Sequence, residues 1–397
     1  MKKGNAWQKG LKENVVAMAG YRHRQQQKKR AIWIFVLVML MVTIFLSMGS
    51  DGDGGGGGGA ACYFFPDSAA CGGKNETEII PVRELTDAEH SARIVIHEIL
   101  NRPSMPSNNP KIAFMFLTPG PLPFERLWHA FFLGHEGKFT VYVHSSRETP
   151  VHVSSYFVGR DIPSKTVEWG KVSMVDAEKR LLAHALLETD NQHFVLLSDS
   201  CVPLRPFDYV YSYLIYSNVS YIDSYEDFGP DGVGRYSDHM MPEVEKKDFR
   251  KGSQWFSMKR QHAIVVLSDF LYYSKFRRFC RPNMNGRNCY ADEHYLPTLF
   301  TMIDPGGISK WSITYVDWSE RKWHPKTYRA KDITANFVKN VTSKNVVIHY
   351  TSDKKRQTPP KTCVWNGLKR PCFLFARKFF PETVDKLLVT LSNYTSS

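Results

Sequence analysis

The chain has 397 residues, of which 43% are hydrophobic and 23% charged, so it can bury one large domain or two small ones. Its formal net charge of +13 favours an anionic ligand such as a phosphate, or else belongs to an ordinary soluble surface. No motif has the aromatic or basic spacing of a nucleic-acid-binding protein, so nucleic acid is not an expected partner.

The first part of the chain has the pattern of a membrane anchor. Residues 1–30 contain nine Lys or Arg and one Glu, and residues 31–48 form an uncharged apolar run of eighteen, about enough to cross a bilayer core. The positive-inside rule then keeps residues 1–30 in the cytoplasm. A cleaved signal peptide is the alternative, but the apolar run is long for one. We predict a single-pass type II membrane protein with its transmembrane segment at residues 31–49.

The following residues differ in composition from the rest of the chain. Residues 49–61 are glycine-rich and acidic, which is typical of a flexible spacer that cannot pack. We interpret residues 50–105 as a stem, with one amphipathic stretch at 88–100. Residues 106–397 are then the lumenal domain.

The seven cysteines favour an oxidising compartment. Nine-residue spacings suit local disulfides and leave the pairing open, with Cys201 as the thiol left over: Cys62/Cys71, Cys280/Cys289 and Cys363/Cys372. No Cys/His spacing resembles a zinc site, so no metal is expected. Four N-glycosylation sequons support the lumenal placement, at Asn75, Asn218, Asn340 and Asn393.

From Lys111 onward, apolar runs of strand length alternate with amphipathic helical stretches. Strands are predicted at 112–118, 139–144, 167–170, 194–198, 255–258, 313–318 and 346–349. Helices are predicted at 124–132, 174–188 with Ser173 as N-cap, 207–219, 261–273, 290–300 and 381–391. Residues 224–250 are polar and glycine-containing, and are interpreted as an exposed loop suited to an acceptor groove. The alternation predicts an α/β fold with a mostly parallel central sheet flanked by helices.

The stretch Phe194–Pro203 places a carboxylate, Asp199, at the end of a buried strand. Ligands of open α/β sheets bind outside the carboxyl ends of the strands, so this stretch is a candidate floor for a nucleotide or sugar pocket. An ordinary core strand with a capped turn is the alternative. Thr118 and His144 close the two preceding strands, and we assign them with Asp199 to nucleotide-sugar binding.

Asp292-Glu293-His294 opens a predicted helix, where the helix dipole favours ionised carboxylates. Locally, a capping box without catalysis is the simpler interpretation. The functional one makes Glu293 a general base that takes a proton from an acceptor hydroxyl. A hydrolase that uses both acids fits less well, because adjacent helical residues point about 100° apart.

The sequence supplies one carboxylate at Asp199 where a metal-binding Asp-x-Asp pair would supply two. A diphosphate then needs another counter-charge, and residues 354–378 hold eight Lys or Arg and no acid. A solvated basic face is the alternative. Trp255, Trp318 and Trp323 lie near predicted loop edges, where indole rings stack on sugars, although buried tryptophans are commoner.

Eight segments together resemble the Core-2/I-branching β-1,6-N-acetylglucosaminyltransferase family, most closely its plant branch. They span about 270 residues in a highly specific order. They are 111–128 (KIAFMFLTPGPLPFERLW), 142–145 (YVHS), 169–183 (WGKVSMVDAEKRLLA), 196–204 (LLSDSCVPL), 250–256 (RKGSQWF), 291–299 (ADEHYLPTL), 315–325 and 371–379 (PCFLFARKF).

The resemblance implies an A-type nucleotide-sugar glycosyltransferase fold and an inverting, metal-independent enzyme of the Golgi membrane. It implies that Glu293 is the catalytic base and that Lys378 binds the diphosphate of a UDP-sugar, with Arg370 or Arg356 as the matching arginine. Arg250, Trp255 and Trp318 are assigned to the acceptor.

Residues 224–250 depart from the animal enzymes, so the transferred sugar stays open among N-acetylglucosamine, glucuronic acid and xylose. No cofactor beyond the donor is expected. A non-catalytic, membrane-anchored glycan- or partner-binding protein with a transferase fold is the alternative.

Overall fold

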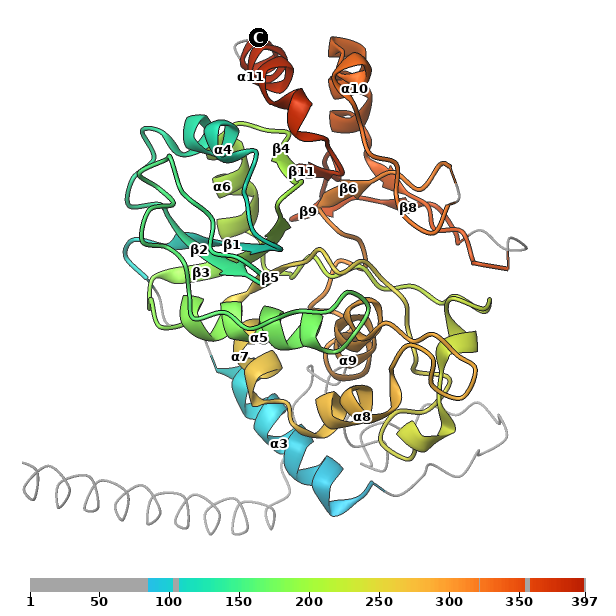
Figure 1. Ribbon diagram of the computed structural model, residues 1–397. Helices are drawn as coiled ribbons and strands as arrows, with labels where there is room; N and C mark the ends of the chain where they lie inside the picture. The colour runs from blue at the N-terminus through green and yellow to red at the C-terminus, as the bar shows by residue number, and fades with distance from the viewer. Residues whose placement is uncertain (1–84, 103–106, 321, 354–357, 396–397) are drawn as a thin grey trace, which may run out of the picture. The chain divides into compact units, whose positions relative to one another are not determined.

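The computed structural model describes residues 85–102, 107–320, 322–353 and 358–395, all within one compact unit, Arg83–Ser397 (Figure 1). The predicted cytoplasmic tail, the anchor at 31–49 and most of the predicted stem lie outside the described residues, as do Asn75 and Arg356. No helix among the described residues is long and apolar enough to cross a bilayer.

A four-stranded sheet in the order β2-β1-β3-β5 forms the centre of this unit. Its strands are β1 (Lys111–Thr118), β2 (Phe139–Ser145), β3 (Asn191–Ser198) and β5 (Ser257–Lys259). β1 is parallel to both β2 and β3, and β5 is antiparallel to β3. The predicted α/β class with a parallel-rich sheet is therefore confirmed.

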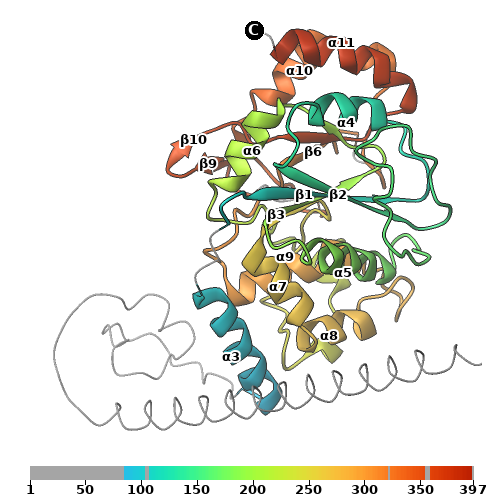
Figure 2. The ribbon, with the colours of Figure 1, turned by 90° about the vertical axis from the view of Figure 1, so that its left-hand side faces the viewer.

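Helices cover both faces of this sheet, as Figures 1 and 2 show. On one face α6 (Phe207–Ile215) packs against β1 and β3. On the other lie α5 (Ser173–Ala185) and α7 (Arg260–Ser268), which also pack against sheet strands. Because both faces are covered, β1 reads as a continuous apolar run rather than an alternating one.

A second, three-stranded sheet brings the C-terminal part of the chain to the end of β3. It contains β4 (Val202–Pro203), β11 (Phe375–Arg377) and β6 (Thr314–Val316), with β11 in the middle. β11 is antiparallel to β4, which begins only four residues after β3 ends. The basic segment at the C-terminal side of β11 is thereby placed beside the polar residues that follow β3.

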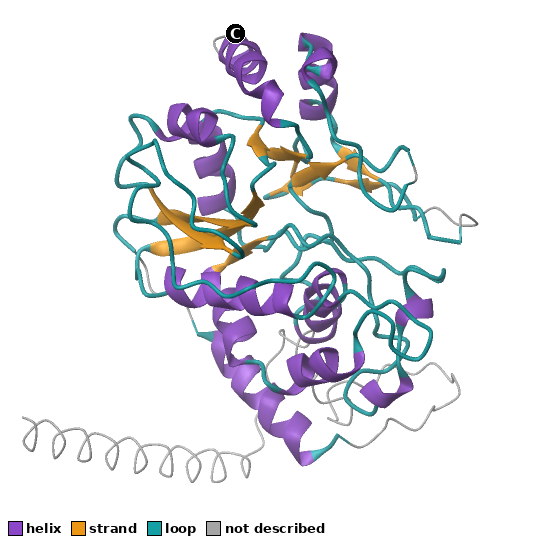
Figure 3. Ribbon diagram, in the orientation of Figure 1, coloured by secondary structure: helices purple, strands orange, loops and turns teal. Residues whose placement is uncertain are grey.

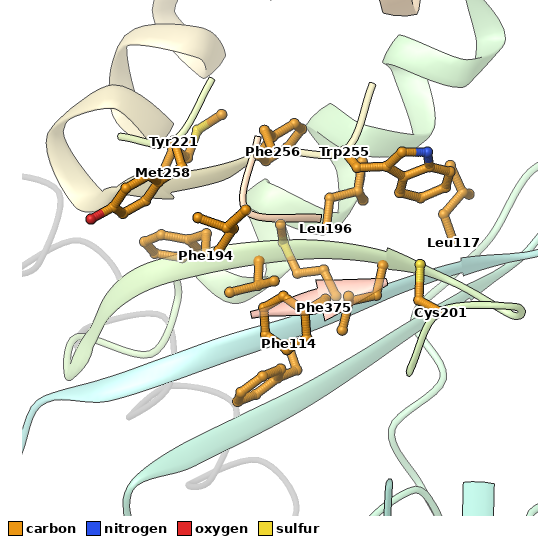
Figure 4. Packing of buried hydrophobic residues seen from close by; sticks show 14 of the residues in the cluster. Phe114, Leu117, Phe194, Leu196, Cys201, Tyr221, Trp255, Phe256, Met258 and Phe375 are labelled. Atoms are coloured by element: carbon orange, nitrogen blue, oxygen red, sulfur yellow. The ribbon is translucent and has the colours of Figure 1, made fainter. Parts of the chain in front are cut away.

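The core between these layers is rich in aromatic rings. The ring centroid of Phe114 on β1 lies 5.0 Å from that of Phe132 and 6.4 Å from that of Phe375, and all three residues are fully buried. Figure 4 shows Phe114 and Phe375 in this core. α4 (Glu125–Phe132) supplies Phe132, so the N-terminal and C-terminal parts of the domain share one core. Truncating such a ring to alanine costs about 3–5 kcal/mol.

Other elements complete the unit, and Figure 3 shows the strands gathered between layers of helices. They are α3 (Asp87–Asn101), η2 (Val233–Arg235), η3 (Asp238–Met240), α8 (Leu271–Phe279), η4 (Ala291–Glu293), α9 (Tyr295–Ile303), η5 (Ala330–Asp332), α10 (Ala335–Thr342), β7 (Val346–Val347), β8 (Lys361–Thr362), β9 (Val364–Trp365), β10 (Leu368–Lys369), η6 (Pro381–Thr383) and α11 (Val384–Thr395). α3 falls in the range interpreted as stem and packs against α7 and α8.

Several predicted elements differ in the structure. Residues 167–170 are not a strand, because Gly170 adopts φ +74° in a turn. Ser173 does not cap α5 through its side chain; its hydroxyl accepts a hydrogen bond from the Glu168 amide at 3.0 Å. The predicted helix 261–273 is two helices, since the Asp269 carboxylate accepts the amides of Tyr272 and Tyr273 and starts α8.

The predicted helix 290–300 is likewise divided. Its first turn is the 3₁₀ helix η4, and α9 begins only at Tyr295. The segment 224–250 is not wholly exposed, because Asp227 and Arg235 are buried within it.

Two of the three expected disulfides lie in the described residues and are formed, Cys280–Cys289 and Cys363–Cys372. Cys62 and Cys71 lie outside them. Cys201 is a free, buried thiol, in agreement with the prediction. The sequon residues Asn218 and Asn340 are exposed, and Asn393 lies in α11.

Candidate active site

Glu293 ends the short helix η4, directly after the loop closed by the Cys280–Cys289 disulfide. Its carboxylate is 2.6 Å from a guanidinium nitrogen of Arg235 and 3.7 Å from the ammonium of Lys251. Its carbonyl accepts the amide of Gly252 at 2.9 Å. The carboxylate that the sequence singles out is thus fixed in place by two cations from a different part of the chain.

Two further acids lie beside Glu293. Burial and the neighbouring Glu293 charge raise the pKa of Asp292 to about 7. Burial raises the pKa of Glu178 on α5 well above its usual range, and Asp292 acts in the same direction. The Glu178 carboxyl accepts a hydrogen bond from the Gln254 amide at 2.9 Å. The Glu178 carboxyl therefore keeps its proton to higher pH than an ordinary glutamate, and Asp292 titrates near neutral pH.

His294 completes the DEH triplet and supports Arg235. It is fully buried, and this burial holds its pKa well below the usual range, so the ring is neutral. Its Nδ1 donates to the Arg250 carbonyl at 2.8 Å, and its Nε2 then faces Arg235 at 3.4 Å. The ring stacks on Phe249 with centroids 4.5 Å apart. His294 acts as a positioning residue for Arg235 rather than as an acid.

The carboxyl ends of the three parallel strands meet at one edge of the sheet. Leu117 on β1 is in register with His144 on β2 and with Ser198 on β3, so Thr118 and Asp199 lie at the same edge. The Thr118 hydroxyl donates to the Gly120 carbonyl at 3.0 Å and closes a turn. The predicted grouping of Thr118, His144 and Asp199 corresponds to this edge.

His144 is fully buried at that edge and is neutral. Burial, together with the Arg180 guanidinium, lowers its pKa to about 4. The Nε2 atom lies 3.0 Å from Arg180, and the Nδ1 atom has no hydrogen-bond partner among the described residues.

Arg377, at the end of β11, faces the same edge. Its guanidinium lies over the Trp255 ring, 4.2 Å from the centroid. Burial lowers the pKa of Arg377, and the Cys201 and Asp199 side chains act against that shift. Figure 4 shows Trp255, Leu117 and Cys201 together at this end of the sheet. Arg377 is the arginine that the fold brings to Asp199.

The segment 250–256 connects this edge to Glu293. Lys251 and Gly252 contact Glu293, while Trp255 lies under Arg377. Between them Gln254 holds the buried acid Glu178. A single stretch of seven residues therefore carries contacts to both the carboxylate and the basic residue of β11.

The other predicted diphosphate residues are placed differently. Lys378 follows Arg377 and is exposed. Arg370 follows the β9–β10 hairpin, with its guanidinium 5.8 Å from the centre of Trp365, whose indole donates to the Tyr213 carbonyl on α6. The structure therefore groups Arg377, and not Arg370, with Asp199.

The predicted acceptor residues also take distinct positions. Trp255 is only 6% exposed, whereas Trp318 is 50% exposed. The Arg250 guanidinium pairs with Glu226 at 3.0 Å, and its carbonyl holds His294. A cavity of about 480 Å³ lies between the loops that follow β1 and β2, lined in part by Pro121, Leu122 and Val151.

Sequence reasoning did not single out Arg235, Lys251 or Glu178, and it included Arg377 only as one of eight basic residues. Arg235 and Lys251 lie 58 and 42 residues before Glu293, in segments without helical or strand periodicity. Glu178 is an acidic residue on the buried face of α5, and that position was a detectable signal. No group of three or more His, Cys, Asp or Glu in the described part of the chain could hold a metal ion.

In a parallel-rich sheet that is covered by helices on both faces, ligands bind outside the carboxyl ends of the strands, and here a carboxylate and basic residues lie at those ends. The family model of the Core-2/I-Branching enzyme matches residues 112–342, more than half of the chain, so this protein belongs to that family. It is a glycosyltransferase. The chain is similar to glycosyltransferase BC10 of rice, Oryza sativa subsp. japonica, with 36% identity over 318 residues, which cover 72% of this chain and 77% of the rice protein. The predicted family and its plant branch are confirmed.

Proposed function

We propose that the protein transfers a sugar, N-acetylglucosamine or glucuronic acid, from a UDP-sugar to a hydroxyl of a glycan or glycoprotein, with inversion at the anomeric carbon. The observation that carries this proposal is the segment 250–256, which contacts Glu293 through Lys251 and Arg377 through Trp255. A base and a counter-charge for the leaving group flank the same stretch of backbone, as a single displacement requires.

Glu293 acts as the general base of this reaction. It takes the proton of the acceptor hydroxyl as the oxygen forms a bond to the anomeric carbon. The bond between that carbon and the phosphate oxygen breaks, and its electron pair leaves with UDP. Arg235 and Lys251 hold the carboxylate on the acceptor side, and His294 holds Arg235.

Arg377 and Lys378 stabilise the departing diphosphate. A positive charge already in place where negative charge develops lowers the barrier without reorganisation. Arg377 has the position for this role at the strand ends, beside Asp199, and it takes the place that the sequence assigned to Arg370 or Arg356. These cations do the work that a divalent metal does in other nucleotide-sugar enzymes, so the reaction is metal-independent.

We further propose that the enzyme is a single-pass type II protein of the Golgi membrane, anchored by residues 31–49 with its C-terminal domain in the lumen. The two disulfides of the described residues and the exposed sequon residues Asn218 and Asn340 support an oxidising, glycosylating compartment.

The test is turnover of the purified full chain with a panel of UDP-sugars: UDP-N-acetylglucosamine, UDP-glucuronic acid, UDP-xylose, UDP-glucose and UDP-galactose. UDP release from one of the first two donors, with and without glycan acceptors, is the expected result. Release only from another donor would correct the transferred sugar. UDP binding without any release, in the presence of acceptors, would contradict catalysis and favour the glycan-binding alternative.

A further inference from the structure

Two tryptophans from distant parts of the chain meet at the surface. Trp169 precedes α5 and Trp323 follows β6, and their rings are in edge-to-face contact with centroids 6.2 Å apart and planes at 83°. Trp169 is 67% exposed and Trp323 is 78% exposed. Both side chains therefore keep more than half of their surface exposed, and together they form an apolar aromatic surface in contact with solvent.

The exposed rings are linked to the proposed base through Tyr290 and Arg235. Trp169 packs on Tyr290 with centroids 5.1 Å apart, and the Arg235 guanidinium lies 4.6 Å from the centre of the same Tyr290 ring. Arg235 in turn contacts Glu293 at 2.6 Å. A continuous series of contacts therefore runs from the exposed Trp169 ring through Tyr290 to Arg235, which forms the ion pair with the Glu293 carboxylate.

The loop that carries Trp169 is held tightly against Tyr290. Gly170 has φ +74°, and a Cβ at this position would come within 2.9 Å of the Tyr290 ring. Only glycine allows both the backbone conformation and the close approach. The packing of Gly170 and Trp169 on Tyr290 therefore fixes the position of Trp169 on the side of the site where Glu293 lies.

Two ion pairs between described residues lie beside the two tryptophans. Lys171 pairs with Glu168 beside Trp169, and Lys322 pairs with Glu320 at 2.8 Å beside Trp323. These pairs satisfy their own charges and offer hydrogen bonds at the rim of the aromatic surface. Such a surface suits a neutral ring with one apolar face better than an acidic sugar.

We propose that Trp169 and Trp323 form an acceptor subsite that binds a neutral hexopyranose ring beyond the sugar that carries the reacting hydroxyl. This inference rests on the proposed glycosyl transfer and names its substrate class: a neutral oligosaccharide of at least two hexoses. Pyranose rings stack their C–H faces on indoles, and the continuity with Tyr290, Arg235 and Glu293 places such a ring on the acceptor side of the site.

The kinetic test uses the full chain and two acceptor series, galactose with β-1,3-galactobiose and galactotriose, and glucose with cellobiose and cellotriose. The double variant Trp169→Ala/Trp323→Ala is expected to raise KM for the trisaccharide of the preferred series about ten-fold, with kcat and the monosaccharide KM changed less than about two-fold. The two Trp→Phe variants should recover most of the affinity. Tyr216→Ala, which removes an exposed aromatic ring at the end of α6, is the matched control.

A binding test gives a readout besides turnover. Tryptophan fluorescence of the wild type should change on titration with galactotriose or cellotriose, and this change should disappear in the double variant. Equal increases in KM for mono- and trisaccharides, unchanged binding in the double variant, or no binding of either series by the wild type would overturn the subsite. UDP release from the donor alone, which does not involve these tryptophans, separates this failure from failure of the proposed function.

Discussion

The basic residues around Glu293 and those at the carboxyl edge of the sheet differ in their ion pairing. Around Glu293 the cations are matched by acids: Arg235 contacts Glu293 and Asp231, and Lys251 contacts Glu293. At the sheet edge, Arg377 and Lys378 form no ion pair within 4.0 Å in the described part of the chain, and the Arg377 Nε has no hydrogen-bond partner there.

The difference indicates a division of labour between the two regions. A carboxylate held by fixed cations is oriented for proton transfer, since its geometry does not depend on the substrate. Arg377 packs on Trp255 and forms no ion pair with an acidic side chain of the described residues. Its guanidinium N–H groups can therefore donate to a bound anion. The four predictions below break or sharpen this contrast, beginning with the largest expected effect.

Glu293→Gln keeps the size of the side chain and removes its basicity. Transfer should fall about 100- to 10,000-fold, the usual contribution of a general base. UDP affinity, measured by calorimetry, should change less than about two-fold, because the variant leaves the sheet edge intact. The control is Glu226→Gln, which removes an exposed acid paired with Arg250. Transfer within ten-fold of wild type in the Glu293 variant would exclude it as the base.

Arg377→Ala should lower kcat about 100- to 1,000-fold and weaken UDP binding, since it removes a preorganised cation from the leaving group. Arg370→Ala should change both quantities less than about three-fold, because Arg370 stacks on Trp365 beside α6. Arg377→Lys keeps a positive charge, so its kcat and UDP affinity are expected to lie between those of the wild type and of Arg377→Ala. Thermal unfolding of each variant separates loss of charge from loss of packing on Trp255. A larger effect of Arg370→Ala would return the diphosphate role to that residue.

The same contrast explains what the sequence could predict. β1 and β3 are buried on both faces, so their apolar runs were visible, and the carboxylates that follow such runs or open a helix, Asp199 and Glu293, stood out with them. The basic residues that contact these carboxylates could not be identified from apolar periodicity. Arg235 lies in a segment without periodicity, and its contact with Glu293 is a product of tertiary folding.

Arg377 illustrates a different limit. It was one of eight basic residues in a run of 25, and only the pairing of β11 with β4 selects it from the others. The β9–β10 hairpin, which precedes Arg377 in the sequence, was detectable because the pair Asn366-Gly367 is the strongest short hairpin signal. In the structure these turn residues have φ values of +46° and +82°.

Asp292→Asn tests the buried acids beside Glu293 through pH. With the Asp292 pKa raised to about 7, the folded protein retains a proton that the unfolded chain releases near pH 4. The free energy of unfolding should therefore fall as pH rises from about 4 to 7, by a few kcal/mol at most at roughly 1.4 kcal/mol per pKa unit. The groups facing Asp292 are Glu178, Glu293 and Arg235.

The Asn variant should lose the part of this pH dependence that comes from position 292, with a flatter profile of Tm between about pH 4 and 7. Glu178→Gln is the companion variant, because burial shifts its pKa in the same direction. Parallel Tm profiles for wild type and Asp292→Asn would show that the carboxyl is ionised throughout that range.

The smallest expected effect is that of chelation. EDTA should change the rate of the wild type less than about two-fold, because the charge that faces the diphosphate comes from Arg377 and Lys378 and Asp199 stands alone at its strand end. Asp199→Asn is the sharper companion. If Asp199 only positions the nucleotide sugar, the variant loses affinity for UDP equally with and without Mn²⁺. If EDTA abolishes transfer and Mn²⁺ restores it in the wild type but not in Asp199→Asn, then Asp199 binds a metal, and the basic residues of β11 assist that metal instead of replacing it.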